Sequence, residues 1–249
     1  MEFTGELLDE TASLEQRKAF WHDVNQRVQP MAPDFMRRDG FRLTTADHVA
    51  QEERLGRAVF DFDCAVLDQM PLGAIIFDFG IGLASEKDYI LYAIRLGLQP
   101  RIWDIESEAL SRGIAKLQSL LKNVVDAPRP EEIISFGDMY QILSMELPPN
   151  LKGIRAFRIL QHFPPIIRKS KLATIGEWIT RTRGHAWFLH PFSDDNPGYK
   201  YGTSFAVSRS EFVQEIQAKA IHPLKISRQK QFKYYVQTYT VFEIARDES

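Results

Sequence analysis

Cysteine is almost absent from this sequence. Cys64 is the single one among 249 residues, so no disulfide can form within the chain. Its flanking residues, VFDFDCAVLDQM, are typical of the buried side of a helix, which predicts a packed core thiol rather than a reactive one. A zinc site built from pairs of Cys and His is excluded, and no cluster of carboxylates indicates another metal. We therefore expect a protein of a reducing compartment that binds no metal.

Long hydrophobic runs and an excess of positive charge are also missing. No run of about 18 apolar residues occurs, and the acidic first residues, MEFTGELLDE, have no apolar core, so we expect neither a membrane span nor a signal peptide. The 31 Lys and Arg residues against 33 Asp and Glu give a formal net charge of -2, which argues against a whole-surface attraction to nucleic acid or anionic lipid. The expected protein is cytoplasmic, acts on a small molecule, and is a monomer or homodimer without nucleic-acid or membrane partners.

What the sequence does contain is a change of pattern near Pro71. Residues 1–70 predict a helical cap, with helices over 13–28 and from about 44 to 70. Residues 71–249 alternate short apolar strands with helical stretches, which predicts an α/β domain with a mostly parallel sheet and helices on both faces. The candidate strands are 73–79, 100–105, 131–137, 153–160, 185–192 and a closing antiparallel strand within 233–246, with helices near 110–124, 166–181 and 209–219.

A glycine turn follows the first candidate strand, where Asp78, Gly80 and Gly82 lead into a helical segment. Glycine permits positive φ and lets a ligand approach the backbone, and the helix that follows offers free N–H groups. A carboxylate here would repel the pyrophosphate of a dinucleotide, whereas S-adenosylmethionine carries an ammonium and a sulfonium and no phosphate. Asp78 therefore favours S-adenosylmethionine over NAD. A turn whose glycines serve packing alone is the alternative.

Two further acids end the next candidate strands. Asp104 ends the strand RIWD, 22 residues after Gly82, where a carboxylate can accept hydrogen bonds from both ribose hydroxyls. The alternative is a cap for the helix that begins near Ser107. Asp138 follows EEIISFG and can accept from an adenine amino group, with a turn aspartate as the alternative.

These segments resemble, in order and spacing, the class I S-adenosylmethionine-dependent methyltransferases. The resemblance covers about residues 75–245 and departs from the family pattern at Ala84, where the family has the third glycine of its turn. It implies a doubly wound, mostly parallel, seven-stranded Rossmann-like sheet and S-adenosylmethionine as cofactor. It assigns cofactor contacts to four strand ends, with Asp78, Gly80 and Gly82 at the methionine moiety, Asp104 and Ile105 at ribose and adenine, Asp138 and Met139 at adenine, and Phe157 and Arg158 on the sulfonium side.

Catalytic candidates come from the loops after the later strands, as in open α/β sheets generally. His162 follows the fourth strand and is a candidate base, with a packed or capping histidine as the alternative. Tyr199 and Tyr201 lie in the polar loop after the fifth strand and are candidates to face the substrate or the sulfonium, unless that loop is a solvated turn. A methyl sulfonium is already activated, so alignment of the acceptor is the main requirement and a base is optional.

The first interpretation is a small-molecule methyltransferase whose helical cap closes over the acceptor. The alternatives are an enzyme that attacks the aminobutyrate carbon of S-adenosylmethionine and releases methylthioadenosine, a binding module without turnover, and an NAD-dependent dehydrogenase, which Asp78 disfavours. A basic stretch before the last strand is interpreted as a solvated face and comprises Lys219, Lys225, Arg228, Lys230 and Lys233.

Overall fold

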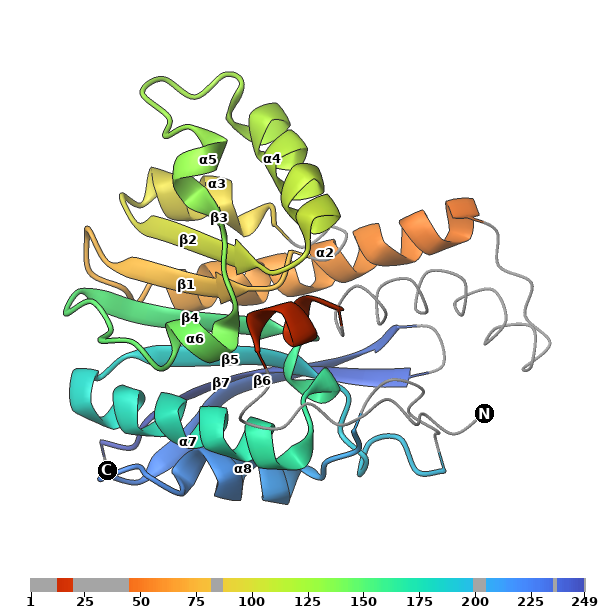
Figure 1. Ribbon diagram of the computed structural model, residues 1–249, viewed down its shortest axis with the longest axis vertical. Helices are drawn as coiled ribbons and strands as arrows, with labels where there is room; N and C mark the ends of the chain where they lie inside the picture. Colours follow the sequence, from red (N-terminus) through yellow and green to blue (C-terminus); the bar gives the residue numbers. More distant parts are fainter. Residues whose placement is uncertain (1–12, 20–44, 82–86, 199–204, 235–236, 249) are drawn as a thin grey trace.

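The computed structural model describes residues 13–19, 45–81, 87–198, 205–234 and 237–248. Within them a seven-stranded sheet has the order β3-β2-β1-β4-β5-β7-β6 (Figure 1). The parallel strands are β1 (Ile75–Phe79), β2 (Gln99–Asp104), β3 (Ile134–Phe136), β4 (Leu151–Phe157) and β5 (His185–His190). The chain runs outward from β1 to β3 and then returns to place β4 beside β1, which confirms the predicted doubly wound, mostly parallel sheet.

The last two strands extend the sheet in the antiparallel sense. β7 (Gln237–Arg246) pairs with β5, as predicted for the closing strand, and β6 (Leu224–Tyr234) pairs with β7 at the edge. The basic stretch was interpreted as a solvated face, and its lysines Lys219, Lys225, Lys230 and Lys233 are exposed, but the sequence analysis did not predict that residues 224–234 form the strand β6. Its side chains alternate between half-buried Ile226 and Phe232 and exposed cations such as Lys225 and Lys233, a pattern suited to an edge strand with one solvated face.

Helices cover both faces of the sheet. Apolar side chains of α2, α3 and α4 join one core cluster with Ile76 and Ile102 of the sheet, and those of α6, α7 and α8 join a second cluster with Ile75 and Phe77. Alternate residues of β1 thus enter opposite layers, as the two-residue period of a strand requires. The helices are α2 (Thr45–Leu67), α3 (Tyr89–Arg95), α4 (Ser107–Leu121), α5 (Pro130–Ile133), α6 (Met139–Ile142), the 3-10 turn η1 (Leu160–His162), α7 (Pro165–Thr182) and α8 (Arg209–Gln217).

Several boundaries differ from the sequence prediction. The expected strand 131–137 begins as the short helix α5, because Pro130 favours a first helical turn and the Glu132 carboxylate accepts from the Arg129 N–H at 3.0 Å. Of the first predicted helix, residues 14–19 are described and helical. Cys64 is half-buried on α2 rather than enclosed in the core. The division into a cap and an α/β domain stays a prediction, although α2 shares a core cluster with the sheet through Val59 and Val66. In the described part of the chain, every helix is too short or too polar to cross a bilayer.

Candidate functional site

The carboxyl ends of β1, β2 and β4 meet at one edge of the sheet, beside the point where the chain order reverses. Gly80 follows β1 with a φ of +82°, a conformation that favours glycine, and its N–H donates to the Trp103 carbonyl at 2.9 Å. The predicted glycine turn therefore joins the ends of β1 and β2. Gly82 lies outside the described residues.

Asp104 is half-buried at the end of β2, beside this turn. One carboxylate oxygen accepts from the Ile81 N–H at 2.6 Å and the other from the Glu106 N–H at 2.9 Å. Burial raises the pKa of Asp104, and the two N–H groups partly oppose that effect. Because each carboxylate oxygen has about two acceptor sites, Asp104 can accept two more hydrogen bonds. The alternative role of helix cap belongs instead to Glu106, which accepts from Glu108 and Ala109 at the start of α4. Ile105 lies half-buried between the two acids.

Asp78 is fully buried and already has three partners from the protein itself. One of its oxygens accepts from Lys87 Nζ at 2.5 Å and from the Tyr89 hydroxyl at 2.7 Å, and Arg155 Nη1 lies 3.3 Å from both oxygens. Lys87 Nζ also donates to the Gly80 carbonyl at 2.8 Å. The acid that favoured a cationic ligand in the sequence is therefore neutralised by the chain's own cations.

Sequence reasoning missed the residues that complete this cluster. Arg155 of β4 also binds Asp63 of α2, whose carboxylate accepts from Trp187 Nε1 of β5 at 2.7 Å. Lys87 is 2% exposed and is not among the residues selected from the sequence. The available signal was a charge inside an apolar segment, since Arg155 stands within the strand LKGIRAF and a buried ion needs a partner.

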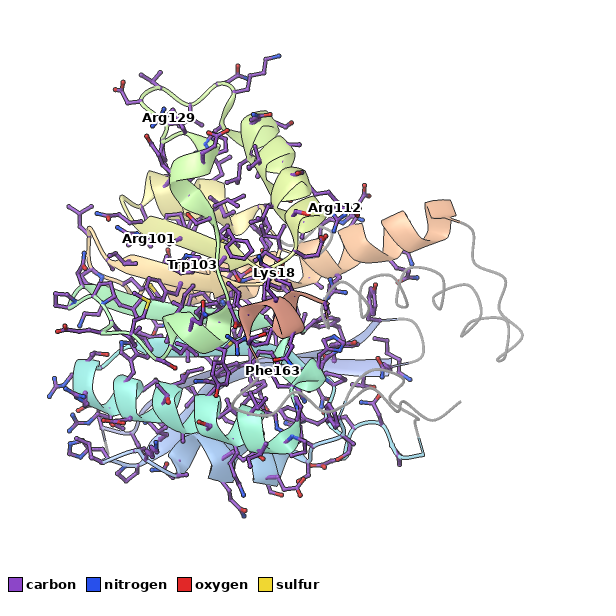
Figure 2. All side chains as sticks on the ribbon, in the orientation of Figure 1. Lys18, Arg101, Trp103, Arg112, Arg129 and Phe163 are labelled. Carbon is purple, nitrogen blue, oxygen red and sulfur yellow. The ribbon has the colours of Figure 1, made fainter. Side chains whose placement is uncertain are left out.

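Asp138 caps α6 and is joined to the amino-terminal part of the chain. Its carboxylate accepts from the Tyr140 N–H at 3.0 Å and forms a buried ion pair with Arg17. The next residue, Met139, is 3% exposed and packs in the second core cluster. Lys18, labelled in Figure 2, lies 4.8 Å from the centre of the Phe136 ring at the end of β3. Residues 13–19 thus cover the same edge of the sheet as Asp138.

The end of β4 carries the two residues assigned to the sulfonium side. Phe157 is buried beneath the guanidinium of Arg155, which lies 3.5 Å from the ring centre. Arg158 follows it with a φ of 56° and donates its N–H to the Leu189 carbonyl of β5. Its guanidinium lies 5.4 Å from the centre of the Tyr234 ring, so the end of β4 reaches the end of β6.

The candidate base His162 ends η1, and its Nε2 lies 3.4 Å from the side-chain amide nitrogen of Gln161. A second histidine that sequence reasoning did not select, His190, ends β5 and is 2% exposed. Its Nε2 has no hydrogen-bond partner among the described residues, and burial lowers the pKa of His190 to about 3. His190 is therefore a neutral core side chain at neutral pH. Tyr199 and Tyr201 lie outside the described residues.

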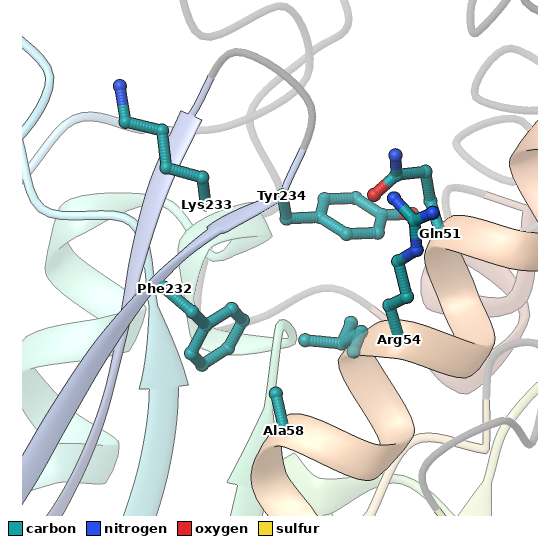
Figure 3. Close-up of a pocket in the computed structure, with 7 residues that line it drawn as sticks. Gln51, Arg54, Ala58, Phe232, Lys233 and Tyr234 are labelled. Atoms are coloured by element: carbon teal, nitrogen blue, oxygen red, sulfur yellow. The ribbon is translucent and has the colours of Figure 1, made fainter.

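A pocket of 310 Å³ lies between α2 and the end of β6 (Figure 3). Leu55, Ala58 and Phe232 give it an apolar wall, while Gln51, Arg54 and Tyr234 bring polar groups together at one end; the Lys233 side chain points away. Since Tyr234 also contacts Arg158, this pocket adjoins the carboxyl end of β4. Among the described residues, no three His, Cys, Asp or Glu side chains cluster in a way that could hold a metal ion.

Comparison by sequence gives no match, either to a protein-family model or to a curated protein. Comparison of structures finds similar proteins. The small RNA methyltransferase HEN1 superimposes with a TM-score of 0.54 at 14% identity over 78% of this chain, which spans 25% of the HEN1 chain. Geranyl diphosphate C-methyltransferase from Streptomyces coelicolor A3(2) superimposes with a TM-score of 0.53 at 11% identity, over 78% of this chain and 81% of that chain. The [4+2]-cyclase SpnF superimposes with a TM-score of 0.54 at 10% identity, over 79% of this chain and 81% of that chain.

In this chain the strand order is 3-2-1-4-5-7-6, and β7 pairs antiparallel with both β5 and β6. The chain has the class I methyltransferase fold. The geranyl diphosphate C-methyltransferase was crystallised in complex with Mg2+, geranyl diphosphate and S-adenosyl-L-homocysteine. SpnF is described as a cyclase, so the methyltransferase fold by itself leaves the reaction open.

Proposed function

We propose that this protein binds S-adenosylmethionine at the carboxyl ends of β1 and β2 and transfers its methyl group to a small-molecule acceptor. The observation that carries the proposal is Asp104, a desolvated carboxylate beside the Gly80 turn with hydrogen-bonding capacity left on both oxygens. Two ribose hydroxyls match that capacity, and hydrogen bonds to a charged acceptor are the stronger kind. Neighbouring structures that hold S-adenosyl-L-homocysteine or sinefungin support the same ligand class.

The described residues fit the two halves of this cofactor unequally. Asp104 suits the adenosine half, whereas Asp78 and Gly80, assigned to the methionine half, both accept hydrogen bonds from Lys87. When bound, the cofactor supplies an activated methyl group. The protein's own task is then to hold an acceptor in line with that group and to exclude water.

The acceptor site in this proposal is the pocket between α2 and β6. Its wall of Leu55 and Phe232 suits an apolar body, and Arg54 with Gln51 suits a polar or anionic end. The contact between Tyr234 and Arg158 links this pocket to the end of β4, on the sulfonium side of the assigned cofactor site. The predicted helical cap would contribute α2 to the acceptor site, and the ion pair between Asp138 and Arg17 would hold the amino-terminal part of the cap beside the end of β3.

A second candidate is a module that binds adenosyl ligands without turnover. The specific observation in its favour is that Lys87 binds the carboxylate of Asp78, which the methionine moiety of the cofactor would need. Product analysis separates the candidates. Methyl transfer releases S-adenosylhomocysteine, attack on the aminobutyrate carbon releases methylthioadenosine, and a binding module releases neither.

The proposed function is tested by calorimetric titration of the full chain with S-adenosylhomocysteine, methylthioadenosine and NAD. We expect both adenosyl thioethers to bind and Asp104→Asn to weaken each about tenfold, the scale of a charge-assisted hydrogen bond. Asp88→Asn is the matched control, because Asp88 stands next to the same turn but pairs with Lys116 at 2.6 Å, away from the end of β2. Binding of NAD alone, or of none of the three, would overturn the proposal.

A further inference from the structure

The ammonium of Lys87 occupies a buried position at the end of β1 that has the chemistry of an amino-acid site. It lies 2.5 Å from a carboxylate oxygen of Asp78 and 2.8 Å from the Gly80 carbonyl oxygen. The Lys87 side chain is 3% exposed and that of Asp78 0%. An anionic acceptor and a carbonyl at these distances form a binding site for one ammonium ion, and the chain itself supplies that ion.

The directly paired charges of this buried cluster balance without a ligand. Asp63 and Asp78 face Arg155 and Lys87, two anions against two cations, and all four side chains are buried. The Lys87-bound oxygen of Asp78 also accepts from the Tyr89 hydroxyl at 2.7 Å, so this oxygen has no capacity for another donor. A second ammonium here would leave one uncompensated positive charge in a desolvated cluster, which is strongly unfavourable.

We propose that Lys87 is an internal competitor for the α-ammonium of an adenosyl amino acid. This inference rests on the proposed function, since it concerns the methionine end of the same site. Lys87 holds Asp78 and the Gly80 carbonyl in the ligand-free protein and has to withdraw before a ligand ammonium can bind there. An adenosyl ligand without an amino-acid chain does not compete with it. Competition from Lys87 therefore lowers the affinity for adenosyl ligands that carry an amino-acid chain, such as S-adenosylmethionine, and leaves the affinity for ligands without that chain unchanged.

The test compares two ligands that differ in the amino-acid chain. S-adenosylhomocysteine carries the ammonium, and methylthioadenosine lacks it. Lys87→Met removes the competing charge and keeps a long side chain, so we expect affinity for S-adenosylhomocysteine to rise about tenfold, as for one buried charged hydrogen bond, while affinity for methylthioadenosine stays within about twofold. Lys116→Met is the matched control, because Lys116 pairs with Asp88 at the surface, and it should change neither affinity.

A ligand-induced rise in Tm provides a second readout that needs no turnover. S-adenosylhomocysteine should stabilise Lys87→Met more than the parent protein, since the ligand ammonium restores the missing cation, whereas methylthioadenosine should stabilise both equally. If Lys87→Met does not fold, Lys87→Gln gives the same comparison with an uncharged side chain that still donates to Asp78. If Lys87→Met binds both ligands more tightly by the same factor, or binds neither more tightly, this inference alone is overturned. Failure of every variant to bind either ligand overturns the proposed function and this inference with it.

Discussion

Arg155 and Asp63 stand 92 positions apart and form a two-point ion pair that joins β4 to α2. The Nε and Nη2 atoms of Arg155 lie 3.1 and 3.2 Å from the two carboxylate oxygens of Asp63. Both side chains are at most 1% exposed, and the Trp187 indole donates to the same carboxylate. Helix α2 is thereby fixed to the sheet by a buried polar contact as well as by its apolar face, which positions one wall of the candidate acceptor pocket.

Asp63→Ala should destabilise the protein by about 3–5 kcal/mol, because it removes the carboxylate that binds the buried Arg155 guanidinium at two points. Urea unfolding followed by circular dichroism measures this loss. Glu53→Gln on the same helix is the control, since its pair with Arg57 is exposed at 3.9 Å and should contribute less than about 1 kcal/mol. Equal losses for the two variants would contradict a structural role for the buried pair.

His190 should make the protein sensitive to acid. Its ordinary pKa of about 6.5 applies in the unfolded chain, and burial, followed by the charge of Arg168, lowers it to about 3 in the folded protein. Between these values the unfolded chain binds a proton that the folded protein does not, so stability falls as pH decreases, by up to about 1.4 kcal/mol per pH unit.

His190→Phe should remove this part of the acid sensitivity, which unfolding midpoints in urea at pH 7 and near pH 4.5 would reveal. His222→Phe is the control, because it makes the same replacement at a half-buried position outside the end of β5. A His190→Phe protein that loses as much stability in acid as the parent would show that His190 does not titrate as described.

The Cys64 thiol should react slowly in the folded protein. Burial, with smaller contributions from Asp63, Asp68 and Asp61, raises the pKa of Cys64 to about 11. At pH 8 the reactive thiolate is then only about one part in a thousand. A thiol-specific reagent should therefore label the folded chain about a hundredfold more slowly than the chain in concentrated urea. Equal rates in the two conditions would contradict the raised pKa.

Gly176 should be intolerant of a side chain. A Cβ atom at this position of α7 would lie 1.8 Å from the backbone carbonyl oxygen of Ile216 in α8. Gly176→Ala should therefore cost about 1–3 kcal/mol or more, despite the better helix propensity of alanine.

The control for this substitution is Gly113→Ala in α4. A Cβ atom there would meet only side-chain atoms, with Ile134 Cδ1 nearest at 2.9 Å, and these can shift. Thermal unfolding should show a clearly lower Tm for Gly176→Ala than for Gly113→Ala. A lower Tm for Gly113→Ala than for Gly176→Ala would indicate that α7 and α8 can move apart without a loss of stability.

Local patterns were sufficient to predict most of the sheet. Strands β1, β2, β4 and β5 are short apolar runs followed by helical segments, and such runs are recognisable without knowing their neighbours. β6 was missed because an edge strand keeps one face in water, so its lysines and arginines concealed the alternation of Ile226 and Phe232. β3 was predicted too long, because Pro130 starts a helical turn just before it.

The sequence by itself determined that acids and a glycine turn stand at the ends of successive strands, because a parallel sheet brings such ends to one edge. It therefore predicted where Asp78, Asp104 and Asp138 lie along that edge. Only the tertiary structure decided which of these acids the chain neutralises itself. Asp78 is paired with Lys87 and Arg155, whereas Asp104 accepts only backbone N–H groups among the described contacts. Ion pairing depends on distances of a few ångströms between segments far apart in the chain, and no local pattern specifies those distances.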